Sequence, residues 1–249
     1  MRKRGSIRGQ VTIFIIVAIF IVAGGILFFV FKDDLGIGKK NNEDVNSVNL
    51  IVNSCLEKTT REGINYVALH GGYFEIPTAL KFPYFTDKYA YYYINSQKHI
   101  PTEETIASEL KKYILFNFKS CINFSSIEQQ GKQITEEEFT VIPQIIEEGV
   151  FVEMEYPITI KTEKDSYRLT DFDTEINENV LNLYLASKEI SESYSLNSGF
   201  VCLNCLDEVS NKYNVNARAT SIGDKNVFVF TISNLEDEEL NWKFVVQNE

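Results

Sequence analysis

Residues 150–160 read VFVEMEYPITI and give the clearest indication of the fold. Apolar side chains alternate with Glu153, Glu155 and Thr159, so an extended segment has one apolar face and one polar face. This period of two predicts a long, half-buried β-strand. The apolar face comprises Val150, Val152, Met154, Tyr156, Ile158 and Ile160.

A polar turn at Lys164-Asp165 returns the chain along residues 167–176, which predicts an antiparallel hairpin. Along the returning segment the apolar positions change phase between Leu169 and Phe172. Such a change moves side chains to the other face unless one extra residue is inserted, so we expect a β-bulge.

Three acids, Asp171, Asp173 and Glu175, alternate along this returning strand and therefore share its outer face. They also resemble the opening of a calcium-binding loop, but Ile176 stands where that loop requires a glycine. We interpret them as a solvated face. The sequence predicts no metal site, no cofactor and no catalytic residue.

Helices and further strands flank the hairpin. Helices are expected from residue 48 to the Gly71-Gly72 pair, from residue 102, from residue 180 and, as a short segment, after residue 205. Strands are expected at residues 73–76, 88–94, 215–222, 227–232 and 240–246. Because helices alternate with antiparallel hairpins, we expect an α+β fold with helices packed on antiparallel sheet. A division of this domain near residue 177 stays open.

The N-terminal part of the chain holds an apolar run, VTIFIIVAIFIVAGGILFFVF, that begins at Val11 and ends at Phe31. At about 1.5 Å per residue a helix of this length matches the hydrocarbon core of a bilayer, so the run predicts a transmembrane helix that contacts the membrane. A cleaved secretory signal is the alternative. The run exceeds the usual ~7–15 apolar residues and no A-x-A site follows it, which favours a retained anchor.

Charge orients this anchor. The first 31 residues contain Arg2, Lys3, Arg4 and Arg8 but no acid, and subtracting these four from the net charge of −11 leaves −15 for the remainder. The positive-inside rule places a basic leader, residues 1–10, in the cytoplasm. Residues 32–47 then form a linker, and residues 48–249 form an extracytoplasmic domain on the plasma membrane. The acidic balance, with a pI of about 4.8, argues against a nucleic-acid partner.

The segment Ile7-Arg8-Gly9-Gln10-Val11-Thr12, followed at once by the apolar run, resembles the class III signal peptides of archaeal type IV pilin-like precursors. The resemblance implies cleavage between Gly9 and Gln10. Pilins usually place a Glu at the fifth position after the cut, where this chain has Phe14, so the resemblance leaves room for a minor or pilin-like protein.

The whole chain also resembles a set of uncharacterised single-span archaeal envelope proteins. The resemblance is carried by Cys55-Leu56, Glu62-Gly63-Ile64, Gly71-Gly72-Tyr73 and Cys121-Ile122-Asn123-Phe124. It implies no known activity.

Four cysteines, Cys55, Cys121, Cys202 and Cys205, are expected to form disulfides outside the cytoplasm. Four cysteines allow three pairings. Proximity in sequence favours Cys202 with Cys205 and leaves Cys55 with Cys121. A redox CxxC and a zinc site are the alternatives for the close pair. A redox CxxC is expected within a βαβ unit, which is missing here. A zinc site usually needs a second cysteine pair, which is also missing.

Two surface hypotheses remain. One strand face would carry three tyrosines, Tyr89, Tyr91 and Tyr93. They could dock a partner or stack on sugars. The alternative is that they belong to a half-buried hairpin.

The second hypothesis concerns Asn123-Phe124-Ser125, which is an N-glycosylation sequon.

No motif of a known enzyme class stands out, and two histidines leave little for general base catalysis. The sequence therefore predicts a membrane-anchored extracytoplasmic protein of the cell envelope that binds or assembles, with other envelope or pilin-like proteins as partners, and not an enzyme. The alternatives are a minor subunit or initiator of a type IV pilus-like filament, and an envelope enzyme acting on glycans.

Overall fold

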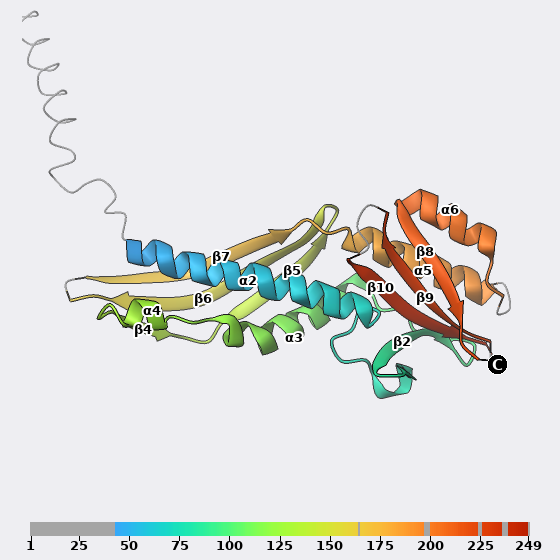
Figure 1. Ribbon diagram of the computed structural model, residues 1–249, viewed down its shortest axis with the longest axis horizontal. Helices are drawn as coiled ribbons and strands as arrows, with labels where there is room; N and C mark the ends of the chain where they lie inside the picture. Colours follow the sequence, from blue (N-terminus) through green and yellow to red (C-terminus); the bar gives the residue numbers. More distant parts are fainter. Residues whose placement is uncertain (1–42, 164, 197–199, 224–225, 236–238, 249) are drawn as a thin grey trace, which may run out of the picture. The chain divides into compact units, whose positions relative to one another are not determined.

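The computed structural model describes residues 43–163, 165–196, 200–223, 226–235 and 239–248 (Figure 1). The expected leader, the apolar run with its Gly9-Gln10 processing site, and most of the linker lie outside these residues. Among the described helices, none combines the length and the apolar character needed to span a membrane. Residues 47–249 form one unit, and helix α2 begins at Glu43, so the end of the expected linker is helical.

The described elements alternate between helices and strands. The helices are α2 (Glu43–Leu69), the 3-10 helix η1 (Thr78–Leu80), α3 (Glu103–Cys121), α4 (Ser125–Glu128), α5 (Val180–Leu196) and α6 (Leu203–Tyr213). The strands are β1 (Lys81–Tyr84), β2 (Asp87–Ile94), β3 (Gln97–Lys98), β4 (Gln133–Glu136), β5 (Thr140–Ile146), β6 (Gly149–Lys161), β7 (Ser166–Ile176), β8 (Val215–Ser221), β9 (Val227–Asn234) and β10 (Asn241–Gln247). The α+β class is confirmed.

The first sheet is antiparallel and is built around β6. Strands β5 and β4 pair in succession along one edge of β6, and β7 pairs along the other edge. The predicted bulge is present, because the β6–β7 register shifts between Glu155 and Ile158. All six apolar residues of the alternating pattern are buried, so the prediction of a half-buried strand is confirmed.

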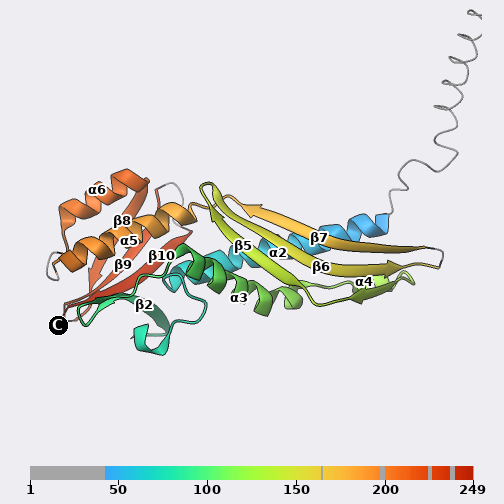
Figure 2. The same cartoon turned by 180° about the vertical axis from the view of Figure 1, so that it is seen from behind.

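Helix α2 lies along one face of this sheet (Figure 1). Figure 2 shows the sheet from behind, and no described helix crosses that face. The uncovered face carries the polar half of the alternation, including Glu153 and Glu155, whose side chains are exposed. The hydrophobic pattern thus decides which face meets the helices.

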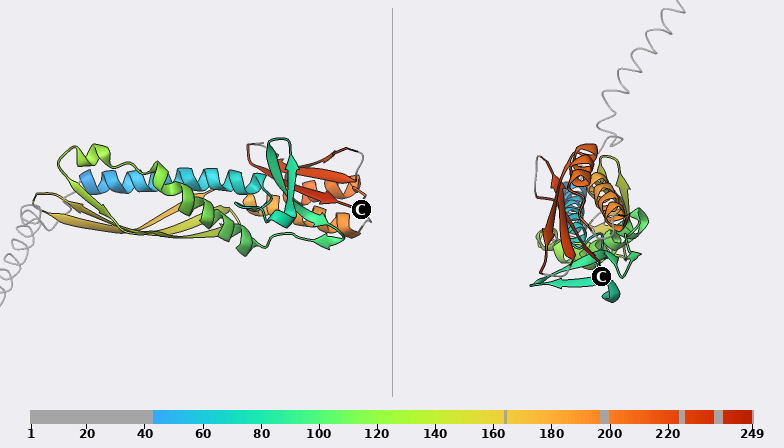
Figure 3. Two further views of the ribbon diagram at one scale, coloured as in Figure 1. Left: turned by 90° about the horizontal axis from the view of Figure 1, so that it is seen from below. Right: turned by 90° about the vertical axis from the view of Figure 1, so that its right-hand side faces the viewer.

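The second sheet has the strand order β1-β2-β10-β9-β8, and β3 pairs with β2. Helices α5 and α6 lie on one side of strands β8, β9 and β10 (Figure 3). The expectation of a purely antiparallel sheet is wrong here, because β2 runs parallel to β10, with Tyr91 opposite Val245. The same pairing joins a strand before residue 177 to three strands after it.

The stretch expected as a strand at residues 73–76 is a loop between α2 and η1. Glu109, a buried carboxylate on α3, accepts hydrogen bonds from the N–H groups of Phe74 and Glu75 at 3.0 and 3.1 Å. The Glu109 side chain therefore accepts hydrogen bonds from backbone N–H groups that, in a strand, would have donated to a neighbouring strand. The predicted helix end is confirmed, because Gly71 and Gly72 follow α2 with φ of 63° and 90°.

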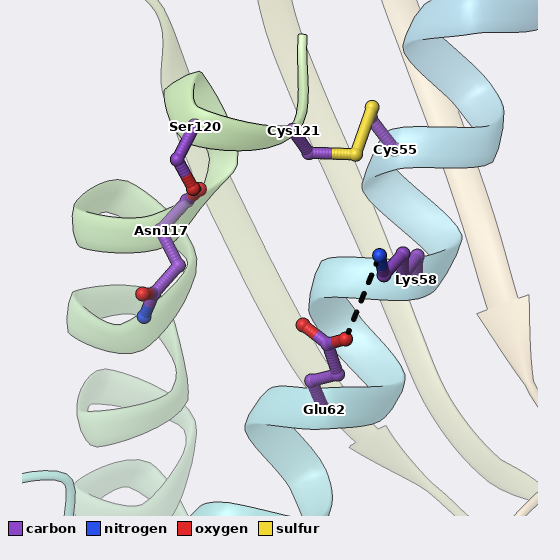
Figure 4. Close-up of a disulfide and its surroundings, with 6 residues drawn as sticks. All are labelled: Cys55, Lys58, Glu62, Asn117, Ser120 and Cys121. Atoms are coloured by element: carbon purple, nitrogen blue, oxygen red, sulfur yellow. Dashed lines mark hydrogen bonds and ion pairs between the residues drawn. A yellow bond between two sulfur atoms is a disulfide. The ribbon is translucent and has the colours of Figure 1, made fainter.

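A disulfide between Cys55 and Cys121 ties α2 to the end of α3 (Figure 4). The two helices also approach closely at Gly63, where an added Cβ would lie 2.8 Å from side-chain carbons of Leu110 and Tyr113. The second disulfide joins Cys202 and Cys205. Both bonds have the pairing that sequence proximity favoured.

Candidate functional site

A hollow of about 380 Å³ lies on the uncovered face of the first sheet. Strands β5, β6 and β7 contribute to it side by side, and its rim is acidic. The carboxylates are Glu153 and Glu155 from β6, and Asp171 and Asp173 from β7. It gathers four carboxylates from two adjacent strands, and we take it as the candidate site.

The strand register places these acids in two rows across the sheet. In one row Thr140, Glu155 and Asp171 lie opposite one another on successive strands. In the next row the order is Ile142, Glu153 and Asp173. Each row therefore sets two carboxylates directly opposite each other, at the distance where cross-strand side chains interact.

Like charges placed directly opposite destabilise a sheet. No residue in the described part of the chain forms an ion pair or a hydrogen bond with any of the four carboxylates through their side chains. The cation on β7, Arg168, donates to Glu137 at 2.8 Å. The hollow therefore presents concentrated negative charge without internal compensation.

The hollow also has an apolar component. Phe151 is half-buried within it, and Ile142 at its edge is 53% exposed. A long basic side chain can lay its methylene groups on such surface while its charged end meets the carboxylates. The arrangement is chemically suited to lysine- or arginine-bearing ligands.

Within the described residues, no group of three or more His, Cys, Asp or Glu is arranged to hold a metal ion. The interpretation of Asp171, Asp173 and Glu175 as an exposed acidic face agrees with their exposure on β7.

The tyrosine hypothesis needs correction. Tyr89, Tyr91 and Tyr93 are all buried, and the first two belong to a core cluster with Val229 and Val245. Burial, followed by the neighbouring Asp87 carboxylate, raises the pKa of Tyr89 to about 12. The reason is that β10 pairs with β2, so β2 is an inner strand and not half of an exposed hairpin.

Asn123 is exposed at the beginning of α4. Its Oδ1 accepts hydrogen bonds from the backbone N–H of Ser125 at 3.0 Å and from the Ser125 hydroxyl at 2.6 Å. These bonds form a local turn just before α4, and the glycosylation itself stays a prediction.

The structure also assembles a surface that sequence reasoning missed. Rings from α2, α3 and the loop after α2 contact one another with centroid distances between 4.2 and 6.0 Å. They are Tyr66, His70, Phe74, Tyr113 and Phe116. The only signal in the sequence was the four-residue spacing of Tyr66 and His70, which puts both rings on one face of a helix.

The acidic hollow was missed for a different reason. Each strand showed its acids on the outer face, but which acid lies opposite which depends on register, and one residue of slippage changes every pair.

Comparison with protein-family models, with curated proteins and with solved structures gives no match to this chain. The geometry of the hollow is therefore the basis for proposing a function.

Proposed function

We propose that this chain is an anchored, extracytoplasmic binding or assembly protein of the cell envelope, and that its acidic hollow receives a cationic segment of a partner protein. The observation that carries the proposal is the set of four exposed carboxylates, paired across β6 and β7 and without a basic partner in the described chain. Positive charge on the partner would remove the repulsion between the two carboxylates of each row, and it would speed the association of the partner with this chain.

The apolar surface narrows the partner class. A small cation would use only the carboxylates, whereas a lysine or arginine side chain would also cover Phe151 and Ile142. Peptide segments with alternating basic residues match the spacing of the two rows, since each strand repeats its outward side chains every second residue. An envelope protein with such a segment is the partner that we propose.

The binding test uses the full-length chain and a deca-lysine peptide, with affinity measured by isothermal titration calorimetry. The double variant Glu153→Gln/Asp173→Asn should weaken binding by about tenfold, which corresponds to ~1.4 kcal/mol. The matched control is Glu147→Gln/Glu148→Gln, which removes the same charge from the β5–β6 turn. An equal loss of affinity in both variants would mean that only the net charge matters, and it would contradict a binding site in the hollow.

The extracytoplasmic location of the acidic domain is tested separately. A tag attached at Glu249 should react with a membrane-impermeant reagent on intact cells if the acidic domain is extracytoplasmic. A tag that reacts only after lysis would contradict this orientation.

The second candidate function is a minor subunit or initiator of a pilus-like filament, and the segment around Gly9-Gln10 favours it. Mass spectrometry of the mature protein separates the two. A chain that begins at Gln10 supports the filament class, and a chain that retains the leader contradicts it.

A further inference from the structure

The Cys202–Cys205 disulfide lies at the beginning of α6, and two residues separate its cysteines. Cys202 is the N-cap of this helix, and the backbone N–H of Cys205 donates to its Sγ with an N to S distance of 3.2 Å. A sulfur in this position meets the positive end of the helix dipole and a hydrogen-bond donor at once. Both favour the thiolate form of Cys202 when the disulfide is reduced.

The two disulfides of the chain differ in what they constrain. Cys55–Cys121 closes a loop with a sequence separation of 66 and joins two helices, and Cys55 is buried. Cys202–Cys205 spans a separation of 3 and joins residues already held together by the first turn of α6. Because a short loop removes less freedom from the unfolded chain than a long one, Cys202–Cys205 contributes less to stability than Cys55–Cys121.

The second bond is also accessible. Both of its cysteines are only half-buried. Two large apolar side chains beside it face solvent, with Phe200 77% exposed and Leu203 70% exposed. Phe200 lines the same small hollow as the two cysteines. Exposed apolar side chains around a half-exposed disulfide are suited to contact with another polypeptide.

We propose that Cys202–Cys205 is a thiol–disulfide exchange site that acts on protein dithiols. A thiolate of the partner attacks Sγ of Cys202, and the bond to Cys205 breaks with its electron pair left on Sγ of Cys205, which takes up a proton. The second thiolate of the partner then attacks the partner's own sulfur in the mixed disulfide. The partner's disulfide forms, Cys202 leaves as a thiolate, and two electrons have passed from the partner to this protein.

The test uses the full-length oxidised chain and reduced, unfolded ribonuclease as the protein dithiol. Loss of ribonuclease thiols is followed by alkylation and mass spectrometry. The wild type should oxidise the probe with stoichiometric appearance of alkylated Cys202 and Cys205. The double variant Cys202→Ser/Cys205→Ser keeps the other disulfide and should give at least tenfold less transfer. Equal transfer by both proteins would overturn the proposal.

A second measurement separates exchange chemistry from mere exposure. In Cys205→Ser the remaining thiol is at the helix N-cap, and in Cys202→Ser it lies within the first turn. The rate of mixed-disulfide formation with oxidised glutathione should be at least tenfold higher for the Cys202 thiol. Equal rates for the two thiols would contradict the assigned role of the N-cap sulfur.

Discussion

Glu153 of β6 lies directly opposite Asp173 of β7 on the uncovered face of the first sheet. The next outward pair along these strands, Glu155 and Asp171, repeats the arrangement. Two successive like-charged pairs destabilise the β6–β7 hairpin, which the burial of its apolar face stabilises. In the proposed function, the charge that lowers the stability of this hairpin is the charge that would attract the cationic partner.

Removal of one such pair should stabilise the domain. The variant Glu153→Gln/Asp173→Asn should raise the free energy of unfolding by about 0.2–1 kcal/mol, since the cross-strand repulsion disappears. Urea unfolding at low ionic strength measures the gain, and added salt should reduce it by screening. The control variant Glu147→Gln/Glu148→Gln should gain less. A loss of stability in the first variant would show that the paired carboxylates do not repel.

The long-range disulfide should contribute more to stability than the local one. Cys55→Ser/Cys121→Ser should lower the free energy of unfolding by about 4 kcal/mol, and Cys202→Ser/Cys205→Ser by about 2 kcal/mol, because loop-closure entropy grows with loop length. Denaturant unfolding followed by circular dichroism measures both. A larger loss for the local pair would contradict the structural role assigned to Cys55–Cys121.

Tyr92 connects two buried polar groups in the second sheet. Its hydroxyl donates to the carbonyl of Gly71 at 3.1 Å and accepts from the indole N–H of Trp242 at 2.9 Å. The variant Tyr92→Phe should cost about 1–3 kcal/mol, because both groups stay buried without a partner. Tyr91→Phe is the control, since its hydroxyl donates to Gln247 in a partly buried position and should cost less. Equal costs in urea unfolding would count against the buried network.

The ion pair beside Tyr156 predicts a pH dependence. Burial by itself raises the pKa of the Glu136 carboxyl, but hydrogen bonds from Lys119 and Tyr156 outweigh burial and hold the pKa below its ordinary value. A carboxyl whose pKa is lowered by folding adds stability above its unfolded-state pKa, and this stability is lost as the pH falls through the folded-state pKa.

The melting temperature of the wild type should therefore exceed that of Glu136→Gln at about pH 7, and the difference should shrink as the pH falls below about 4.5. Thermal unfolding across this range is the measurement. Glu138→Gln changes an exposed neighbour and should show no such convergence. A difference independent of pH would contradict the role of the ionised carboxylate.

Local patterns determined much of the fold from the sequence alone. The alternation in residues 150–160 determined a long strand and its buried face, since neighbouring side chains on a strand point to opposite sides. Thr102 determined the start of α3, where its side chain accepts a hydrogen bond from the N–H of Thr105. Proximity of Cys202 and Cys205 determined the disulfide pairing. Each of these depends on interactions between residues close together in the chain.

Tertiary structure decided what depends on distant residues. The parallel pairing of β2 with β10 joins segments about 150 residues apart and buries Tyr89 and Tyr91, which the local pattern had left ambiguous. The register of β6 against β7 set Glu153 opposite Asp173, although each strand had shown its acids only as an outer face. Sequence periodicity specifies which side of a strand is buried, but the neighbour that a strand meets is chosen by the packing of the whole chain.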